Sequence, residues 1–319
     1  MLTTLNTVFH AIFPVFFLIG LGYFLFKKAF LTKEIQQGLN KIAYWIGLPA
    51  FLFYKVANAK FQSGTTANIF FCVMAGTASS MLVAYLMAKL NKMPRSSRGA
   101  SIQAGGRGNL AFIALPIVIY SVNLIAPTKA DSLIDSAILV LTPMVIIYNL
   151  ISVSILTVHS DNPSENLKKD IALGLTKNPL IISCVLGLSW NLFGLTITEG
   201  ASLHRICESL GRAAFPMALL GIGCQLAQIP SSSRIIHAAQ ISLIKCVLAP
   251  FVGFLLSRIL NMDNSETLVT LILLSTPTAV AAYVLADQLN CDADLTAGVI
   301  ACSTTFSFIS FSTILLIFQ

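Results

Sequence analysis

One apolar stretch of membrane-spanning length carries polar residues in its middle that could bind an anion. The stretch covers 98–121, and its interruption consists of Gly105, Gly106, Arg107, Gly108 and Asn109. An Arg at the centre of a spanning helix costs about 2.5–3.5 kcal/mol on insertion scales, so Arg107 should face a wet cavity, a partner or a substrate. A guanidinium, an amide and the unpaired N–H groups of a half-helix together suit a carboxylate ligand.

The interruption also has the features of a helix break. Asn109 is a favourable N-cap for a second half-helix that begins at Leu110, and Gly105 and Gly106 suit a left-handed end to the first half-helix. Pro116 weakens the second half because it offers no backbone N–H. Two further roles stay open at this point: Arg107 as a pin that bonds freed carbonyls, and Asn109 as a cap alone.

A second stretch, 266–288, also has the features of a broken helix, but with different residues. Ser275 and Thr276 can cap, and Pro277 is placed at the first position of a new half-helix, where its missing N–H is harmless. Broken backbone at membrane depth is tolerated only where it is buried in protein or lines a wet cavity. Two such breaks in corresponding places predict a substrate site at the midplane.

The candidate site residues lie at the two breaks or on the helices that follow them. The candidates for substrate binding are Arg107, Asn109, Gly108, Thr276, Pro277, Gln103, Thr142 and Ser303, and those that shape the crossover are Gly105, Gly106, Pro116 and Pro277. Tyr148 and Asn149 suit either the cavity or helix contacts. Lys245 is expected to reach an interface or to pair with Asp287.

The composition places the chain among polytopic helical membrane proteins. Of its 319 residues 56% are hydrophobic and 10% charged, against roughly a quarter charged in soluble proteins. The net charge of +7 needs no nucleic-acid partner, because cytoplasmic loops are rich in Lys and Arg. No basic residue precedes the first apolar run, from Val8 to Phe26, which therefore reads as a membrane helix rather than a cleaved signal peptide.

Apolar periodicity predicts ten membrane spans in two halves. The spans are near 7–26, 36–57, 67–90, 98–121, 133–157, 178–195, 203–227, 236–258, 266–288 and 293–317. The most polar segment separates them, so that 1–157 is one five-helix repeat, 158–177 a cytoplasmic linker and 178–319 the second repeat. Lys and Arg concentrate in alternate loops, which predicts that these loops are cytoplasmic and that both termini lie outside.

An odd number of spans per half turns the second half upside down relative to the first. Three features recur at nearly constant offsets of 165, 167 and 168 residues: Pro14 with Pro179, Pro49 with Pro216, and Asn109 with Pro277. Inverted repeats are a common plan for secondary transporters, so the two halves are expected to be related in this way.

Other chemistries lack support in the sequence. There is no phosphate-binding GxxxxGK[ST] loop, no HExxH and no CxxC motif, so neither an enzyme nor a cofactor or metal site is expected. No Asp or Glu occurs between Glu34 and Asp131, although a cation transporter usually needs carboxylates at the midplane. A coupling ion, H⁺ or Na⁺, is left open.

The run Arg107-Gly108-Asn109-Leu110-Ala111-Phe112 with Pro116, the run Ser275-Thr276-Pro277 and the ten spans resemble the auxin efflux carrier family. The resemblance covers essentially the whole chain. It implies an all-α fold of two inverted five-helix repeats with crossed broken helices four and nine, similar to the antiporter NhaA and to bile-acid transporters. Without the long central loop of plant members, the chain looks like a bacterial member.

The resemblance implies a permease of the cytoplasmic, inner membrane, with a small carboxylate such as malonate as substrate and with a homodimer as its assembly. Where the plant carriers use an acid and a Lys in the second span, this chain offers only Lys41 and Lys55. Two alternatives remain on the sequence alone. One is a cation/proton antiporter using Asp287, Asp292 or Asp294, and the other is a membrane sensor that binds without transporting.

Overall fold

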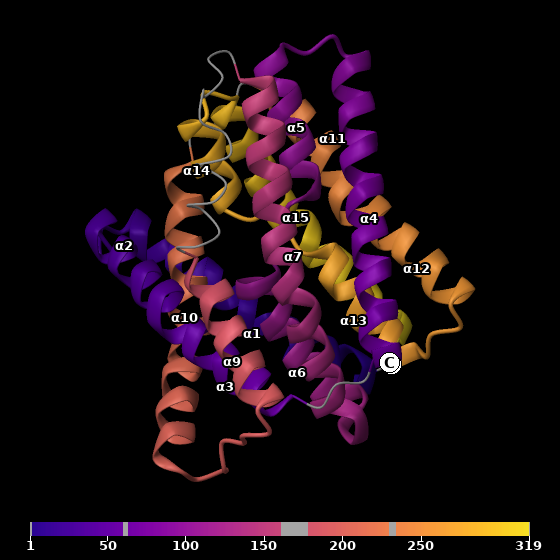
Figure 1. The fold of residues 1–319 in the computed structure, drawn as a ribbon. Coiled ribbons are helices and arrows are strands. Elements are labelled where there is room, and N and C mark those ends of the chain that lie inside the picture. The colour runs from indigo at the N-terminus through magenta and orange to yellow at the C-terminus, as the bar shows by residue number, and fades with distance from the viewer. Residues whose placement is uncertain (1, 60–62, 161–177, 230–233, 319) are drawn as a thin grey trace.

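The computed structural model describes residues 2–59, 63–160, 178–229 and 234–318, which are helical nearly throughout (Figure 1). Most of the predicted linker, 161–177, lies outside the described residues. The helices are α1 (Leu2–Lys27), α2 (Lys33–Ile42), η1 (Ala43–Gly47), α3 (Leu48–Asn58), α4 (Ser63–Leu90), α5 (Arg95–Gly106), η2 (Leu110–Ala114), α6 (Leu115–Ile125), η3 (Pro127–Lys129), α7 (Ala130–His159), α9 (Pro179–Leu192), α10 (Ser202–Gln228), α11 (Ile235–Leu243), η4 (Ile244–Leu248), α12 (Ala249–Ile259), α13 (Asn264–Ser275), α14 (Ala281–Gln288) and α15 (Ala293–Phe318).

The expectation of an all-helical polytopic membrane protein is confirmed. By length and composition, six helices of the described residues are able to cross a membrane: Val8–Lys27, Gly64–Leu90, Pro127–His159, Ser202–Gln228, Ile235–Ile259 and Ala293–Phe318. Leu110–Ile125 and Pro179–Leu192 are shorter apolar helices. Many large apolar side chains stay exposed on the protein surface, as expected where the surrounding solvent is lipid.

The helices pack as two groups. The first, called the panel here, contains α1, α2, η1, α3, α9 and α10, in which α1 packs along α10 and α3 along α9. The second, called the crossover bundle, contains α4 to α7, η2 to η4 and α11 to α15, in which α4 contacts α5 and α12, and α11 contacts α15. Figure 1 shows α2, α3, α9 and α10 on the left and α4, α11, α12 and α13 on the right.

Two helix pairs of the bundle are broken and cross in opposite directions. In Figure 1 the chain runs downward from α5 to α6 and upward from α13 to α14, and both breaks lie near the middle of the molecule. The two linkers pair through an antiparallel bridge between Gly108 and Thr278. The N–H of Asn109 donates to the carbonyl of Pro277 at 2.9 Å, and the N–H of Ala279 donates to the carbonyl of Arg107 at 3.0 Å. Each break thus provides hydrogen-bond partners for backbone groups that the other break leaves unpaired.

The local geometry corrects two expectations. Gly105 and Gly106 do not form a left-handed helix end, because both belong to α5 and the positive-φ glycines of the described residues are Gly194 and Gly200. A Cβ on Gly105 would lie 2.9 Å from the Cβ of Ala84, so this glycine allows α5 to approach α4. Pro277 does not start a half-helix either: α14 begins at Ala281, and Pro277 lies in the extended linker whose carbonyl Asn109 engages.

Each of the three π-helical turns in the described residues precedes a proline. The turns η1, η2 and η4 are followed at the second position of the next α-helix by Pro49, Pro116 and Pro250. Proline lacks the N–H that would bond the carbonyl four residues earlier, and its ring clashes with that carbonyl. A wider turn moves the carbonyl away, so these helices continue past the proline instead of ending there.

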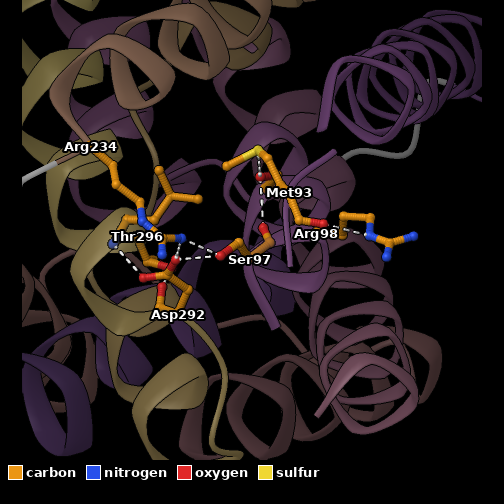
Figure 2. Close-up of polar contacts among 8 residues, drawn as sticks. Met93, Ser97, Arg98, Arg234, Asp292 and Thr296 are labelled. Atoms are coloured by element: carbon orange, nitrogen blue, oxygen red, sulfur yellow. Dashed lines mark hydrogen bonds and ion pairs between the residues drawn. The ribbon is translucent and has the colours of Figure 1, made fainter. Parts of the chain in front are cut away.

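Ion pairs at both ends of the crossover bundle connect its helices to one another. At one end Arg234 contacts the carboxylate of Asp292, which also accepts a bond of 2.6 Å from Ser97 Oγ (Figure 2). This cluster joins the starts of α5, α11 and α15. At the other end Lys129 pairs with Asp263 at 2.6 Å. These contacts lie within the bundle, so they favour a bundle that moves as a rigid body.

Candidate functional site

A cavity of about 290 Å³ lies where the broken segments of the bundle face the panel. Its lining comes from both groups of helices and consists of Asn40, Tyr44, Arg107, Gly108, Asn109, Leu110, Ala111, Phe112, Val145, Tyr148, Asn149, Asn178, Leu180, Ala218, Ile222, Gln225, Ala279, Val280, Ala281 and Val284. Ala281 and Val284 are exposed, so the cavity reaches the protein surface. Its size suits a small metabolite rather than a large ligand.

Arg107 is anchored on α7 at one wall of this cavity. Its guanidinium donates to Asn149 Oδ1 at 2.8 Å, to Ser152 Oγ at 3.1 Å and to the carbonyl of Tyr148 at 3.4 Å. These bonds use three of the five N–H groups of the guanidinium. Since all three acceptors are neutral, the positive charge of Arg107 is fixed in place and not cancelled.

Asn109 caps the second half-helix, and its amide nitrogen lies outside this cap. It is the N-cap of η2, with its Oδ1 accepting from the N–H of Phe112 at 3.4 Å. Only the oxygen of the amide is used in this cap, which leaves the amide N–H groups as donors at the cavity wall. The predicted start of the second half-helix at Leu110 is confirmed, although its first turn is π-helical.

The cavity has one sign of charge. Arg107 is the ionised side chain among the described lining residues, and that set contains no Asp or Glu. The remaining polar side chains are amides and phenols, namely Asn40, Asn109, Asn149, Asn178, Gln225, Tyr44 and Tyr148. A partly buried guanidinium among neutral polar groups in a mainly apolar cavity is arranged to receive an anion.

The other predicted site residues lie beside the cavity rather than in its lining. Thr276 Oγ1 donates to the carbonyl of Asn109 at 3.0 Å, and Ser303 Oγ accepts from the N–H of Thr278 at 3.0 Å. Thr142 Oγ1 bonds the carbonyl of Ile138 at 3.0 Å. Gln103 and Pro277 are likewise outside the lining. Thr276 and Ser303 thus hold the break linkers in shape, while Arg107, Gly108 and Asn109 face the cavity.

Several lining residues were not predicted from the sequence. Asn40 and Tyr44 come from α2 and η1, Gln225 from the last turns of α10, and Asn178 is the N-cap of α9. One sequence signal could have identified three of them: Asn40, Asn178 and Gln225 are amides that each lie near the end of a predicted span. Sequence spacing alone does not show that these ends converge on Arg107.

A second cavity of about 390 Å³ has a different character. It lies between α3, α6 and α10, and its charged lining residues are Lys55, Glu199, Glu208 and Arg212. Arg212 pairs with Glu208 at 2.7 Å. Because both signs of charge line it and neither break linker does, it is the weaker candidate for an anion site.

Lys245 does not behave as expected from the sequence. It lies in η4, its side chain is 0% exposed, and its Nζ has no hydrogen-bond partner among the described residues. It neither reaches an interface nor forms a salt bridge with Asp287 there.

Comparison with known proteins agrees with this picture. The profile of the family described as membrane transport protein matches residues 7–315. An uncharacterized transporter of Methanothermobacter thermautotrophicus is 23% identical over 304 residues, covering 94% of this chain and 95% of that protein. Another, from Methanocaldococcus jannaschii, is 22% identical over 302 residues, covering 92% and 93%. The resemblance to auxin efflux carriers is thereby confirmed: the chain belongs to this family of membrane transport proteins, which are transporters and not enzymes.

Proposed function

We propose that this chain is a secondary transporter that carries a small organic anion, a carboxylate, across the cytoplasmic membrane. The observation that carries the proposal is the cavity at the crossover, which contains Arg107 and no described carboxylate. The substrate would accept hydrogen bonds from the free N–H groups of Arg107 and from the amide of Asn109. Its carbon atoms would contact apolar lining residues such as Val145 and Val280.

The fold supports transport by alternating access. In this proposal the chain has ten spans in two inverted repeats, residues 1–157 and 178–319, with both termini outside. The crossover bundle moves against the panel and carries the site with it. The lining residues Asn40, Asn178 and Gln225 lie at span ends that the Lys and Arg distribution assigns to the cytoplasm. The cavity therefore corresponds to an inward-facing state.

The acids of the chain fit this function better than cation/proton exchange. Asp292 pairs with Arg234 at the end of the bundle, and Asp263 pairs with Lys129 at the opposite end. Neither acid lines the cavity at the breaks.

Flux measurements in proteoliposomes test the proposal. Purified protein should take up radiolabelled malonate or another small mono- or dicarboxylate, and Arg107→Gln should reduce the initial rate by at least about tenfold, since hydrogen bonds to a charged group contribute about 1.5–3 kcal/mol. Arg258→Gln is the matched control, because this arginine lies over the ring of Phe254 on an exposed face. Normal uptake by Arg107→Gln, or flux of Na⁺ or Li⁺ in place of carboxylates, would contradict the proposal.

A further inference from the structure

The C-terminal end of α13 is buried at the crossover without its expected hydrogen-bond donors. The last four carbonyls of any α-helix lack intrahelical partners. Here the N–H groups that follow the helix are committed elsewhere: Thr278 donates to Ser303 Oγ at 3.0 Å and Ala279 donates to the carbonyl of Arg107 at 3.0 Å. Pro277 has no N–H to give. In the described residues no side chain is recorded as a donor to these carbonyls.

The corresponding end of α5 is capped. Donors from three places reach its final carbonyls: the N–H of Arg107 bonds Gln103 at 2.9 Å, Thr278 Oγ1 bonds Ala104 at 2.7 Å and Ser80 Oγ bonds Gly105 at 2.9 Å. The two helix ends at the crossover are therefore not equivalent. The partial negative charge at the end of α13 is left for another group to balance.

Lys245 is placed to balance it. A Cβ built on Gly108 would lie 2.6 Å from Thr276 Cγ2 and 3.2 Å from Lys245 Nζ, so the ammonium lies at the crossover beside the residue that ends α13. The segment η4, which carries Lys245, contacts α13. The side chain is fully buried, and its Nζ has no hydrogen-bond partner among the described residues.

Two other roles for this ammonium do not fit. Lys245 is not in the lining of the cavity at Arg107, so a substrate there would not touch it. The salt bridges of the described residues pair other groups, which leaves Lys245 without a recorded carboxylate partner. The uncapped end of α13 is the source of negative potential that the structure places beside it.

We propose that Lys245 is a tethered cation that stabilises the broken helix α13–α14. An ammonium on a side chain cannot leave during a transport cycle. Lys245 is in this view a positioning residue for the crossover and not a group that binds substrate.

Chemical rescue tests the charge directly in the purified full-length protein. Lys245→Ala removes three methylene groups and the ammonium, the atoms of n-propylammonium. We expect Lys245→Ala to unfold about 5 °C below the wild type, and millimolar n-propylammonium to recover at least half of this loss. 1-Propanol, which has nearly the same shape without the charge, should recover clearly less of it, because it fills the cavity but supplies no charge. Equal rescue by the alcohol and the amine would overturn the proposal.

Lys245→Met is the second variant, because it keeps the volume of the side chain and removes only the charge. It should unfold below the wild type but above Lys245→Ala, which also leaves a cavity, and a wild-type melting temperature for Lys245→Met would overturn the proposal. If neither neutral variant gives folded protein, Lys245→Arg decides. A monodisperse Lys245→Arg supports the tethered cation, and a misfolded Lys245→Arg refutes it.

Discussion

Arg107 is useful as a binding group only if its guanidinium is held still. Asn149 Oδ1 accepts from it at 2.8 Å and Ser152 Oγ at 3.1 Å, both on α7. Holding the guanidinium by neutral acceptors preserves its charge for a ligand, whereas a carboxylate in the same position would cancel that charge. Asn149 is thus a residue whose chemical type matters more than its shape.

Asn149→Asp tests this reading with a change that keeps the shape. The new carboxylate should form a salt bridge with Arg107, so carboxylate uptake should fall by at least about tenfold, the loss of a charged hydrogen bond to substrate. The melting temperature should stay within a few degrees of wild type, because the pair is satisfied internally. Uptake in proteoliposomes and a thermal melt measure the two effects. Undiminished transport by this variant would exclude Arg107 as the anion-binding group.

The sequence predicted the part of the site that is local along the chain. Asn109 was recognised because an N-cap is determined by its own residue and the next three. Pro277 was misplaced because its conformation depends on a hydrogen bond to Asn109, 168 positions away in sequence. Asn40 and Gln225 were missed for the same reason: each becomes a lining residue only when α2 and α10 meet the bundle.

Among the elements, α1 and α10 show how the panel is held together. A Cβ on Gly22 would lie 2.9 Å from Leu220 Cα, and one on Gly223 would lie 2.7 Å from the backbone N of Tyr23. Such backbone-to-backbone contact is typical of small residues at membrane helix interfaces. By contrast, a Cβ on Gly20, two residues before Gly22, would meet nothing within 4 Å.

Gly22→Ala and Gly20→Ala form a matched pair on one helix. Both exchanges gain the same helix propensity, but only the first forces α1 away from backbone atoms that cannot move aside. Overpacking of this kind costs about 1–3 kcal/mol, which corresponds to a melting temperature lower by roughly 5 °C. Gly20→Ala should melt at or above the wild-type temperature. Equal melting temperatures for the two variants would mean that α1 and α10 are not in close contact.

The start of α13 is fixed by Asp263. Its side chain accepts from the N–H of Glu266 at 2.8 Å in a capping box, and it pairs with Lys129 at 2.6 Å. Burial raises the pKa of Asp263, but the hydrogen bond from Lys129 and those from the N–H groups of Glu266 and Ser265 outweigh it and leave this pKa below its ordinary value. The folded state therefore favours the ionised carboxylate.

Asp263→Asn should retain the cap and lose the charge. Because the folded pKa of Asp263 is depressed, its stabilisation is present above the unfolded pKa of about 3.9 and is lost as pH falls through the folded value. The wild type should melt slightly above Asp263→Asn at pH 7, and the difference should close below about pH 4. Asp263→Ala, which also loses the cap, should cost about 1 kcal/mol more. A difference that widens at low pH would contradict this account.

The π-helical turns before Pro49, Pro116 and Pro250 show which features of a helix the sequence pattern does not predict. A proline inside an apolar run signals a disturbed helix, and of these three the sequence pattern predicted it for Pro116 alone. Whether the helix ends, kinks or widens by one residue depends on the neighbours that hold it straight. Near Pro250, for example, α12 packs against both α4 and α13.

In the molecule as a whole, ion pairs connect the helices of the crossover bundle to one another. The panel contacts the bundle through aromatic packing and a hydrogen bond to sulfur. Phe16 of α1 packs edge-on against Phe308 of α15, with ring centroids 5.1 Å apart. Thr142 on α7 donates to the Sγ of Cys184 on α9 at 3.1 Å. Mainly apolar surfaces that share few directional bonds in the described residues can slide on one another at low cost, which supports relative motion of the two groups.

Thr142→Cys provides a lock between the two groups, because the introduced thiol would face the native Cys184. Oxidation should form a disulfide between α7 and α9 and stop carboxylate uptake, and a reducing agent should restore it. The same variant with Cys184→Ser should be insensitive to the oxidant, which controls for the other native cysteines. Full transport with the disulfide formed, as verified by mass spectrometry, would show that α7 and α9 do not separate during the cycle.

The most direct test is equilibrium binding by titration calorimetry, using acetate, malonate and succinate together with their neutral amides. At least one of the carboxylates should bind the wild type more tightly than its amide, and Arg107→Gln should weaken that binding by about tenfold or more. Arg258→Gln should bind as the wild type does. Amides that bind as well as the acids, or an Arg107→Gln variant with unchanged affinity, would contradict an anion site at the crossover.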